Sequence, residues 1–380
     1  MGEFRLMQII NDYTGTRVYQ NFAASLDYLG VEQIIYTAIR NGSRIDSYSL
    51  NFSCEGSGIY YRNILTVIDR VLYGEKISRI YKDVIKTVPI DEVDIIHAHT
   101  WYSDGGVAYE IYKQYGIPYI VAVRNTDLNL FFKYMLHLRK YGLEILEHAK
   151  KIIFISPVYK DRLFGLIANR PELLVKGIII PNGIDSFWLQ NIYERKRAIH
   201  DRINLLFVGE FTKGKNVFKL IKAVERLVIE GFDCTLHLVG GGGSEEKKIL
   251  DYIRVKNRFV FYGKVLDRNR LLEIFRSCDI FTMPSRSETF GLVYIEALSQ
   301  GLPVLYTINE GIFGYYNNSI GEAVDSDRVE DIARGIKSII TNFDAYQFDI
   351  DRILKNHDWS NIALEYLKVY SDVLKNDTYS

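Results

Sequence analysis

Short apolar runs alternate with longer stretches of helical periodicity along nearly the whole chain, and this alternation limits the fold more than any other feature. The runs lack polar alternation, so each predicted strand has to be buried on both faces. A parallel sheet with helices on both sides meets that requirement. The predicted strands of the first half cover residues 6–10, 34–36, 94–97, 119–123, 152–155 and 178–180.

The alternation stops at a turn and then begins again. Pro181, Asn182 and Gly183 have strong turn chemistry, and a charged stretch follows at 194–202. The second set of predicted strands covers residues 205–209, 236–240, 259–263, 280–283 and 304–306. Because 380 residues are too many for one ordinary core, two domains are expected.

We therefore predict an α/β fold of two Rossmann-like, doubly wound parallel-sheet domains that face each other across a cleft. The domains cover residues 1–183 and 184–355, with the hinge between 182 and 200. Ligands of such sheets bind at the carboxyl ends of the strands. Segment 356–380 keeps helical periodicity and is expected to complete the second domain or to cross back to the first.

Composition and charge exclude several classes of protein. The formal net charge is zero, whereas a nucleic-acid binder should carry a basic footprint. The sequence has neither a run of about 18 apolar residues nor a secretory signal, so a cytoplasmic location is expected. Cys54, Cys234 and Cys278 are far apart and lack metal-ligand spacing, which indicates reduced thiols.

Two glycine-marked turns follow predicted strands of the second half. Residues 209–216 differ from a P-loop at one position, where Asn216 replaces the hydroxyl residue that holds magnesium. Lys215 is expected at a helix N-terminus, where its charge and the helix dipole both attract phosphate. A solvated lysine is the alternative. The four glycines of residues 240–243 are better explained by structure than by ligand binding.

A third turn, PSRSETFGLVYIEA at residues 284–297, is the most informative. A helix is expected to begin near Phe290, so that free N–H groups face an anion and Gly291 allows close approach. Glu288 lies in the loop, and Glu296 lies about a turn and a half into the helix. Two carboxylates beside an anion site suit the hydroxyl groups of a ribose and a sugar.

Segment 288–296 resembles the E-x7-E signature of retaining GT-B glycosyltransferases of family 4. PNGID at 181–185, Gly209 with Lys215, and GLPV at 301–304 are similar to family positions too. The resemblance implies a metal-independent transfer from a nucleotide diphosphate sugar, UDP-sugar favoured over GDP-sugar, without a cofactor. The implied acceptor is a saccharide or lipid-linked saccharide held by the first domain, in surface polysaccharide or glycoconjugate biosynthesis.

The resemblance also assigns roles to single residues. Lys215 would neutralise the donor diphosphate, Glu296 would bind the ribose hydroxyls, and Glu288 would lie beside the reacting carbon. Further donor-binding positions by the same resemblance are Gly15, Gly209, Glu210, Gly263, Lys264, Val265, Phe290, Gly291 and Leu292.

Two positions depart from the family pattern. Glu210 stands where the family often has arginine. Arg124-Asn125-Thr126-Asp127 stands where it commonly has His-Gly-x-Asp, so Arg124 and Asp127 complete the predicted catalytic set. Arg124 can meet a sugar oxygen or a phosphate but cannot act as a base at neutral pH. Three alternatives stay open: an inactive nucleotide-sugar-binding partner, a nucleotide-sugar epimerase, and a P-loop phosphotransferase.

Three further patterns have competing interpretations. His97 and His99 face one side of a strand, but without a third ligand they are expected to be cleft-lining or satisfied polar groups. The Asp325-Ser326-Asp327 triplet is expected to cap a helix, and no catalytic metal is expected. Segment 131–141 mixes aromatic residues with cations. It predicts either a packed helix or a peripheral contact with the inner face of the membrane or a lipid-linked acceptor.

Overall fold

The computed structural model describes residues 4–194, 199–316 and 320–377, and the chain divides into two compact units. The first unit comprises Met1–Ile155, Tyr159–Gly183 and Trp359–Ser380. The second comprises Ser156–Val158 and Ile184–Asp358. Each unit has one parallel sheet with helices on both faces, which confirms the prediction of two Rossmann-like domains.

In the described part of the first unit, seven parallel strands form one sheet in the order β3-β2-β1-β4-β5-β6-β7. The strands are β1 (Arg5–Ile9), β2 (Glu32–Ala38), β3 (Gly58–Arg62), β4 (Ile95–Ala98), β5 (Tyr119–Val123), β6 (Lys151–Phe154) and β7 (Gly177–Ile179). The strand order reverses between β1 and β4. Doubly wound sheets bind their ligands at the carboxyl ends of the strands beside such a reversal.

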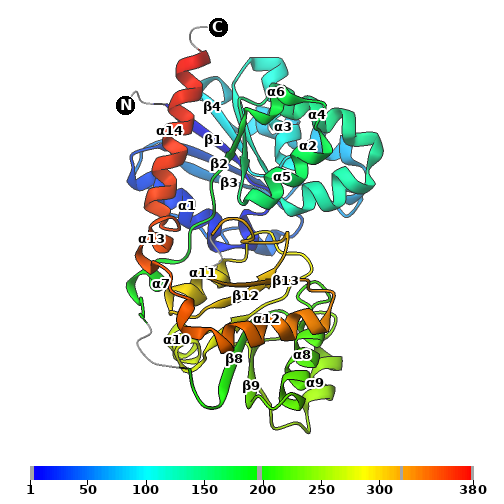
Figure 1. Ribbon diagram of the computed structural model, residues 1–380. Coiled ribbons are helices and arrows are strands. Elements are labelled where there is room, and N and C mark those ends of the chain that lie inside the picture. Colours follow the sequence, from blue (N-terminus) through cyan, green and yellow to red (C-terminus); the bar gives the residue numbers. More distant parts are fainter. Residues whose placement is uncertain (1–3, 195–198, 317–319, 378–380) are drawn as a thin grey trace. The chain divides into compact units, whose positions relative to one another are not determined.

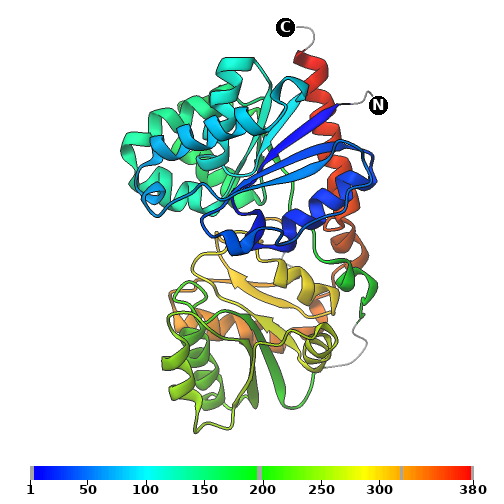
Figure 2. The same ribbon diagram turned by 180° about the vertical axis from the view of Figure 1, so that it is seen from behind.

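Helices α1 and α14 cover one face of this sheet, and α2 to α5 cover the other (Figures 1 and 2). The helices are α1 (Arg17–Tyr28), α2 (Tyr73–Thr87), α3 (Ser103–Tyr115), α4 (Arg139–His148), α5 (Pro157–Leu166), α6 (Pro171–Leu174) and α14 (Trp359–Asp377). Short turns lie between them: η1 (Tyr13–Gly15), η2 (Gly42–Arg44), η3 (Ile68–Arg70), η4 (Ile90–Glu92), the π-helical η5 (Asp127–Phe132) and η6 (Leu136–Leu138).

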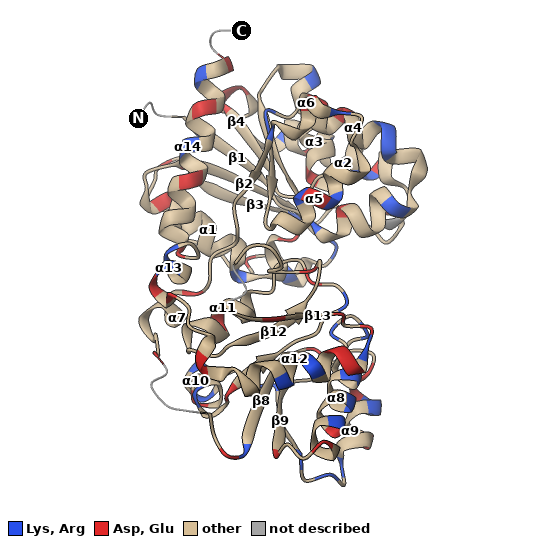
Figure 3. Ribbon diagram, viewed as in Figure 1, with Lys and Arg blue, Asp and Glu red and all other residues tan. Residues whose placement is uncertain are grey.

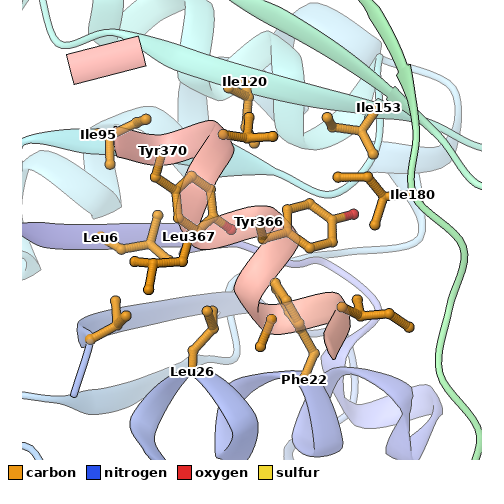
Figure 4. Packing of buried hydrophobic residues seen from close by; sticks show 14 of the residues in the cluster. Leu6, Phe22, Leu26, Ile95, Ile120, Ile153, Ile180, Tyr366, Leu367 and Tyr370 are labelled. Carbon is orange, nitrogen blue, oxygen red and sulfur yellow. The ribbon is translucent and has the colours of Figure 1, made fainter. Parts of the chain in front are cut away.

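The C-terminal helix α14 is part of the core of the first unit. Its Tyr366, Leu367 and Tyr370 are buried against the sheet and against α1 (Figure 4). The residues packed around them come from five strands or strand ends and from α1: Leu6, Ile95, Ile120, Ile153, Ile180, Phe22 and Leu26. Burying a large apolar side chain stabilises a fold by about 1.5–3 kcal/mol, so α14 contributes much of this unit's stability.

In the described part of the second unit, six parallel strands form one sheet in the order β10-β9-β8-β11-β12-β13. The strands are β8 (Ile203–Gly209), β9 (Cys234–Gly240), β10 (Phe259–Gly263), β11 (Ile280–Thr282), β12 (Val304–Thr307) and β13 (Gly321–Val324). Here the order reverses between β8 and β11, so their carboxyl ends mark the expected ligand position.

The second sheet is also covered on both faces. Helices α8 and α12 pack together on one face, and α11 packs with α7 and α13 on the other. The helices and the short turn η8 are α7 (Ser186–Gln190), α8 (Val217–Ile229), α9 (Glu246–Ile253), α10 (Arg268–Ser277), α11 (Leu292–Ser299), α12 (Val329–Thr341), η8 (Phe343–Ala345) and α13 (Ile350–Lys355). Charged residues lie mainly on helices and loops, while the strands stay largely uncharged (Figure 3).

Two local predictions are wrong. Segment 131–141 is not one helix, because η5 ends at Phe132, η6 follows, and α4 begins at Arg139. Asp325 does not cap α12 either. Its carboxylate accepts a hydrogen bond from the Asp327 N–H at 2.9 Å, and the N-cap residue Arg328 makes no side-chain cap.

Candidate active site

The loops after β8 and β11 meet at the carboxyl edge of the second sheet. The two strands are paired neighbours, so the segments that leave them begin side by side. The Arg286 N–H donates a hydrogen bond to the Gly214 carbonyl at 2.8 Å, which ties one loop to the other. Sheet topology therefore brings together the first and third turns that the sequence predicted to be functional.

Lys215 and Glu288 form an ion pair between these loops. The Lys215 Nζ lies 2.5 Å from the Glu288 Oε2 and 3.8 Å from the Met283 Sδ. The Lys215 side chain is 28% exposed and that of Glu288 is 12% exposed. The ammonium group thus has a fixed position but keeps an open side, as a group that meets a ligand must.

The Glu288 loop is held by its backbone. The Glu288 N–H donates to the Glu310 carboxylate at 2.9 Å, and the Gly311 N–H donates to the Glu288 carbonyl at 2.9 Å. Gly291 has φ +83°, and a Cβ there would lie 2.6 Å from the Tyr294 ring. Glycine is therefore required at the point where the loop turns into α11.

Helix α11 offers backbone N–H groups to this site. Gly291 occupies its N-cap position, and no side chain caps the helix there. The first N–H groups of an α-helix lack partners inside the helix, and the dipole favours an anion in front of them. Phe290 is buried against Tyr315 and His357, with ring centroids 5.5 and 5.2 Å away, and so anchors the residue before the cap.

Asn216 has a structural task in the P-loop-like turn. Its backbone is left-handed, with φ +58°, at the N-cap of α8. Its side-chain amide donates to the Pro284 carbonyl at 3.2 Å and to the Ser326 carbonyl at 2.7 Å. The residue that would hold magnesium in a P-loop is therefore a buried amide whose donors bind neighbouring loops.

Glu296 lies on α11 in a crowded, charged setting. The Trp188 side chain hydrogen-bonds to its carboxylate, while Arg268 forms a two-pronged ion pair with Asp185 at 2.9 and 2.8 Å. Burial raises the pKa of Glu296 to about 7. The negative charge of Asp185 adds to this rise, and Arg268 opposes it.

The remaining predicted donor positions of the second unit lie at strand ends. Gly209 ends β8 and is followed by the exposed Glu210, while Gly263 ends β10 with φ +68°. Lys264 is exposed and Val265 half-buried. The Lys264 Nζ would lie 3.6 Å from a Cβ on Gly242, so its side chain reaches the four-glycine turn.

In the first unit, Asp127 binds backbone rather than facing an open site. Its buried carboxylate accepts hydrogen bonds from the N–H groups of Trp101 and Tyr102 at 3.0 Å each and of Arg124 at 2.8 Å. Burial raises the pKa of Asp127, and these hydrogen bonds oppose the rise. The side chain thus fastens the loops that follow β4 and β5.

Only part of the Arg124 guanidinium group is hydrogen-bonded among the described residues. Its Nε donates to the His99 carbonyl at 3.2 Å, while its Nη1 has no hydrogen-bond partner among the described residues. The side chain lines a small pocket with Tyr19, His99, Trp359 and Tyr366. An oxygen atom that entered this pocket would meet the Nη1 donor, which has no other partner among the described residues.

His97 at the end of β4 and His99 just after it are buried, and each uses only one ring nitrogen in a hydrogen bond among the described residues. The His97 Nδ1 lies 2.8 Å from the Tyr370 hydroxyl, the His99 Nε2 lies 2.8 Å from the Gln8 Oε1, and the rings stack at 3.8 Å. Burial lowers the pKa of both rings well below the ordinary value. The described residues contain no group of three or more His, Cys, Asp and Glu side chains that could hold a metal.

A buried carboxylate after β4 had no predicted role. Asp104 accepts a hydrogen bond from the Asn11 N–H at 3.2 Å, across the reversal between β1 and β4. Burial raises its pKa to about 7, and the charge of the buried Lys76 opposes the rise. Gly15 lies nearby in η1, where a Cβ would lie 2.4 Å from the Asp12 Oδ1. The only sequence signal was an acidic residue followed by two glycines after a strand.

Two family models match consecutive parts of the chain. The model for Glycosyltransferase Family 4 matches residues 15–186, and the model for Glycosyl transferases group 1 matches residues 190–348. The chain belongs to the GT-B glycosyltransferases of family 4. This family membership makes it a glycosyltransferase.

Relatives of this glycosyltransferase are distant in sequence. An uncharacterised glycosyltransferase of Methanocaldococcus jannaschii is 23% identical, over 87% of this chain and 90% of the relative. Glycogen synthase of Mycobacterium tuberculosis is 26% identical, over 73% and 68%. Sucrose-phosphate synthase of Thermosynechococcus elongatus has the same fold, with a TM-score of 0.74 at 18% identity, over 98% and 100% of the two chains. Among the described residues of this glycosyltransferase, no helix is long and apolar enough to cross a membrane.

Proposed function

We propose that the chain transfers a sugar, with retention of anomeric configuration, from a nucleotide diphosphate sugar to a saccharide or lipid-linked saccharide. UDP-sugar is favoured over GDP-sugar, and neither a metal nor a cofactor takes part. The observation that carries this proposal is the Lys215–Glu288 pair at the β8/β11 reversal, beside the uncapped N-terminus of α11.

The diphosphate of the donor would lie between Lys215 and α11. An ammonium group and free helix N–H groups are fixed there before substrate arrives. Preorganised charges and dipoles stabilise the negative charge that grows on a leaving phosphate. Lys215 supplies the positive charge that a metal ion provides in other transferases. Glu296 would accept hydrogen bonds from the ribose hydroxyls, in its ionised form.

The transfer itself would need few protein groups. The bond between the anomeric carbon and the phosphate oxygen breaks, and the acceptor oxygen bonds to the same face of that carbon. The acceptor proton passes to the leaving phosphate oxygen, so that no separate base is required. Glu288 would lie beside the transferred sugar, where its charge stabilises the electron-poor anomeric carbon.

The first unit would bind the acceptor. Its polar groups gather beyond the carboxyl ends of β1, β4 and β5, where Asn11, Asp104 and Arg124 each have a side-chain atom without a hydrogen-bond partner among the described residues. Such atoms need oxygen or nitrogen partners, which sugar hydroxyls and water both supply. In this proposal Arg124 meets an oxygen of the acceptor.

A ligand panel tests the proposal. Thermal unfolding with UDP, GDP, ATP and several UDP- and GDP-sugars, with and without EDTA, reports which ligand the folded chain binds. UDP and UDP-sugars are expected to raise the midpoint equally with and without EDTA. NMR of the product formed on a saccharide acceptor then gives its anomeric configuration. A shift with ATP that requires magnesium would overturn the proposal in favour of a phosphotransferase.

Two alternatives give different products in the same assay. An inactive nucleotide-sugar-binding partner would be stabilised by UDP-sugar yet form no product with any acceptor. An epimerase would change the donor sugar without an acceptor. The inactive partner is favoured by the two positions that depart from the family pattern, Glu210 and Arg124.

A further inference from the structure

Four large aliphatic side chains are exposed within six residues at the start of α2. Val67, Ile68, Val71 and Leu72 are 74%, 62%, 78% and 49% exposed. They lie in and around η3, directly before the helix begins at Tyr73. Single exposed apolar residues are ordinary, but such a group in one short segment marks a contact surface.

A second exposed apolar segment lies beside the first. Leu130, Tyr134 and Leu136 are 43%, 66% and 61% exposed. The Tyr73 and Phe131 rings are in edge contact, with centroids 6.0 Å apart, so residue 72 and residue 130 flank the same aromatic pair. Segments 67–72 and 130–140 together are called the apolar–basic surface below.

The charged side chains of segment 130–140 are all basic. Lys133 and Lys140 are exposed, and Arg139 lies over the Phe132 ring at 4.8 Å, while residues 128–141 contain no acidic residue. The nearest carboxylate to Lys140 in the next helical turn is Glu144, with its oxygen 4.0 Å from the Lys140 Nζ. In the first segment, Asp69 is buried and paired with Arg79 at 2.9 Å, so its charge is compensated. Apolar side chains next to exposed cations are typical of proteins that lie on anionic membranes.

We propose that the apolar–basic surface binds the face of an anionic lipid bilayer. The aliphatic side chains of segment 67–72 would enter the interface, and Lys133 and Lys140 would contact lipid phosphates. A second copy of the chain is a poorer occupant, because a two-fold interface would place the same cations face to face. This inference goes beyond the proposed sugar transfer and stands without it, since membrane binding requires no donor.

Vesicle co-sedimentation of the full chain tests the proposal without nucleotide or sugar. Phosphatidylcholine vesicles with and without phosphatidylglycerol serve as the probe. The unmodified chain should sediment with the anionic vesicles and be released by added salt. The pairs Val67→Ser with Val71→Ser and Lys133→Glu with Lys140→Glu should each lower the partition coefficient at least about tenfold.

Matched variants separate this surface from general effects of composition. Ile229→Ser with Val255→Ser removes aliphatic residues that are 86% and 88% exposed in the second unit. Lys82→Glu with Lys86→Glu reverses exposed charges at the far end of α2. Both controls should bind vesicles like the unmodified chain. All eight positions are exposed, and circular dichroism checks that each variant folds.

Three results would overturn the proposal. The unmodified chain could stay in the supernatant with anionic vesicles, it could bind both vesicle types equally, or the two surface variants could bind as it does. Sedimentation equilibrium adds a fourth. A dimer that the surface variants disperse, in a chain that ignores vesicles, would assign the surface to a second copy.

Discussion

The ammonium of Lys215 lies 2.5 Å from the carboxylate of Glu288, although 73 residues separate them in the chain. The Glu288 carboxylate pairs with the Lys215 ammonium, which is the cation that a donor diphosphate would need. Ligand binding and this ion pair therefore compete for Lys215. The two residues should respond differently to mutation, even though they touch.

Replacing Glu288 with glutamine should separate binding from turnover. The substitution removes a negative charge beside the proposed diphosphate site and frees Lys215, so UDP should bind a few-fold more tightly. Turnover should fall by about 10²- to 10³-fold, because a charge aimed at the reacting carbon is lost. Calorimetric titration with UDP and a transfer assay measure the two effects. Weaker UDP binding by Glu288→Gln would contradict the competition.

Lys215→Ala should lower both UDP binding and turnover, because it removes the ammonium group that lies between the two loops. UDP affinity and turnover should each fall by at least about tenfold, as expected when a charged hydrogen bond is removed. Lys337→Ala is the matched control. It also breaks a lysine–glutamate pair of the second unit, with Glu230 at 3.1 Å, but on the exposed face of α12. Its kinetics should match those of the unmodified chain.

The pKa of Glu296 makes stability depend on pH in a defined direction. Burial raises it from 4.5 to about 7, so between these values the folded state holds a proton that the unfolded state has lost. Stability must then fall as pH rises through this window. Glu296→Gln cannot ionise, so its midpoint relative to the unmodified chain should increase from pH 5 to pH 8. Thermal melts at both values measure this difference.

The same carboxyl group should control nucleotide binding. Only its ionised form accepts two hydrogen bonds from ribose hydroxyls, so UDP affinity of the unmodified chain should rise as pH passes about 7. Glu296→Ala should bind UDP weakly, and Glu296→Gln should keep only the shallower pH dependence that comes from the terminal phosphate of UDP, whose own pKa is about 6. An equal pH dependence in the glutamine variant would remove Glu296 from the proposed site.

Sequence periodicity predicted most of the fold because most strands are buried on both faces. Strands such as β5 (Tyr119–Val123) have five buried residues in a row, which leaves an unbroken apolar run. The missed strands, β3 and β13, lie at sheet edges, where one side has no neighbouring strand. β3 is half-buried throughout, and β13 contains Gly321 and Glu322, so neither shows an apolar run.

Those candidate site residues that lie in glycine-marked turns had strong signals in the sequence. Lys215, Glu288 and Gly291 stand in glycine-marked turns with strong residue signals. The Asp127 and Asn216 contacts were not predictable, because they join loops that only sheet order makes neighbours. Asp104 was missed for the same reason, since its partner Asn11 lies 93 residues away in the chain.

Substitution of Gly240, the first residue of the four-glycine turn, should change the free energy of unfolding and not the chemistry of the site. At Gly240 the φ is +117°, and a Cβ would lie 2.0 Å from the Gly209 carbonyl oxygen of the neighbouring strand. Gly240→Ala must therefore move β8 or β9 and should destabilise the second unit by more than about 2 kcal/mol. Gly231→Ala is the control, because φ is +95° there but nothing lies within 4 Å of the added atom. It should cost only about 1 kcal/mol in urea unfolding.

Asp127→Asn should act through stability rather than turnover. The Asp127 Oδ2 accepts hydrogen bonds from the Trp101 and Arg124 N–H groups, and its Oδ1 accepts one from the Tyr102 N–H. In Asp127→Asn one of these oxygens becomes an NH₂ group, which then faces at least one backbone N–H donor. A buried donor without an acceptor costs about 1–3 kcal/mol, which urea unfolding would detect. Asp161→Asn, at an exposed position of α5, should cost almost nothing. Below its melting temperature, Asp127→Asn should keep most of its kcat. A drop of about 10²-fold in kcat with unchanged stability would instead make Asp127 catalytic.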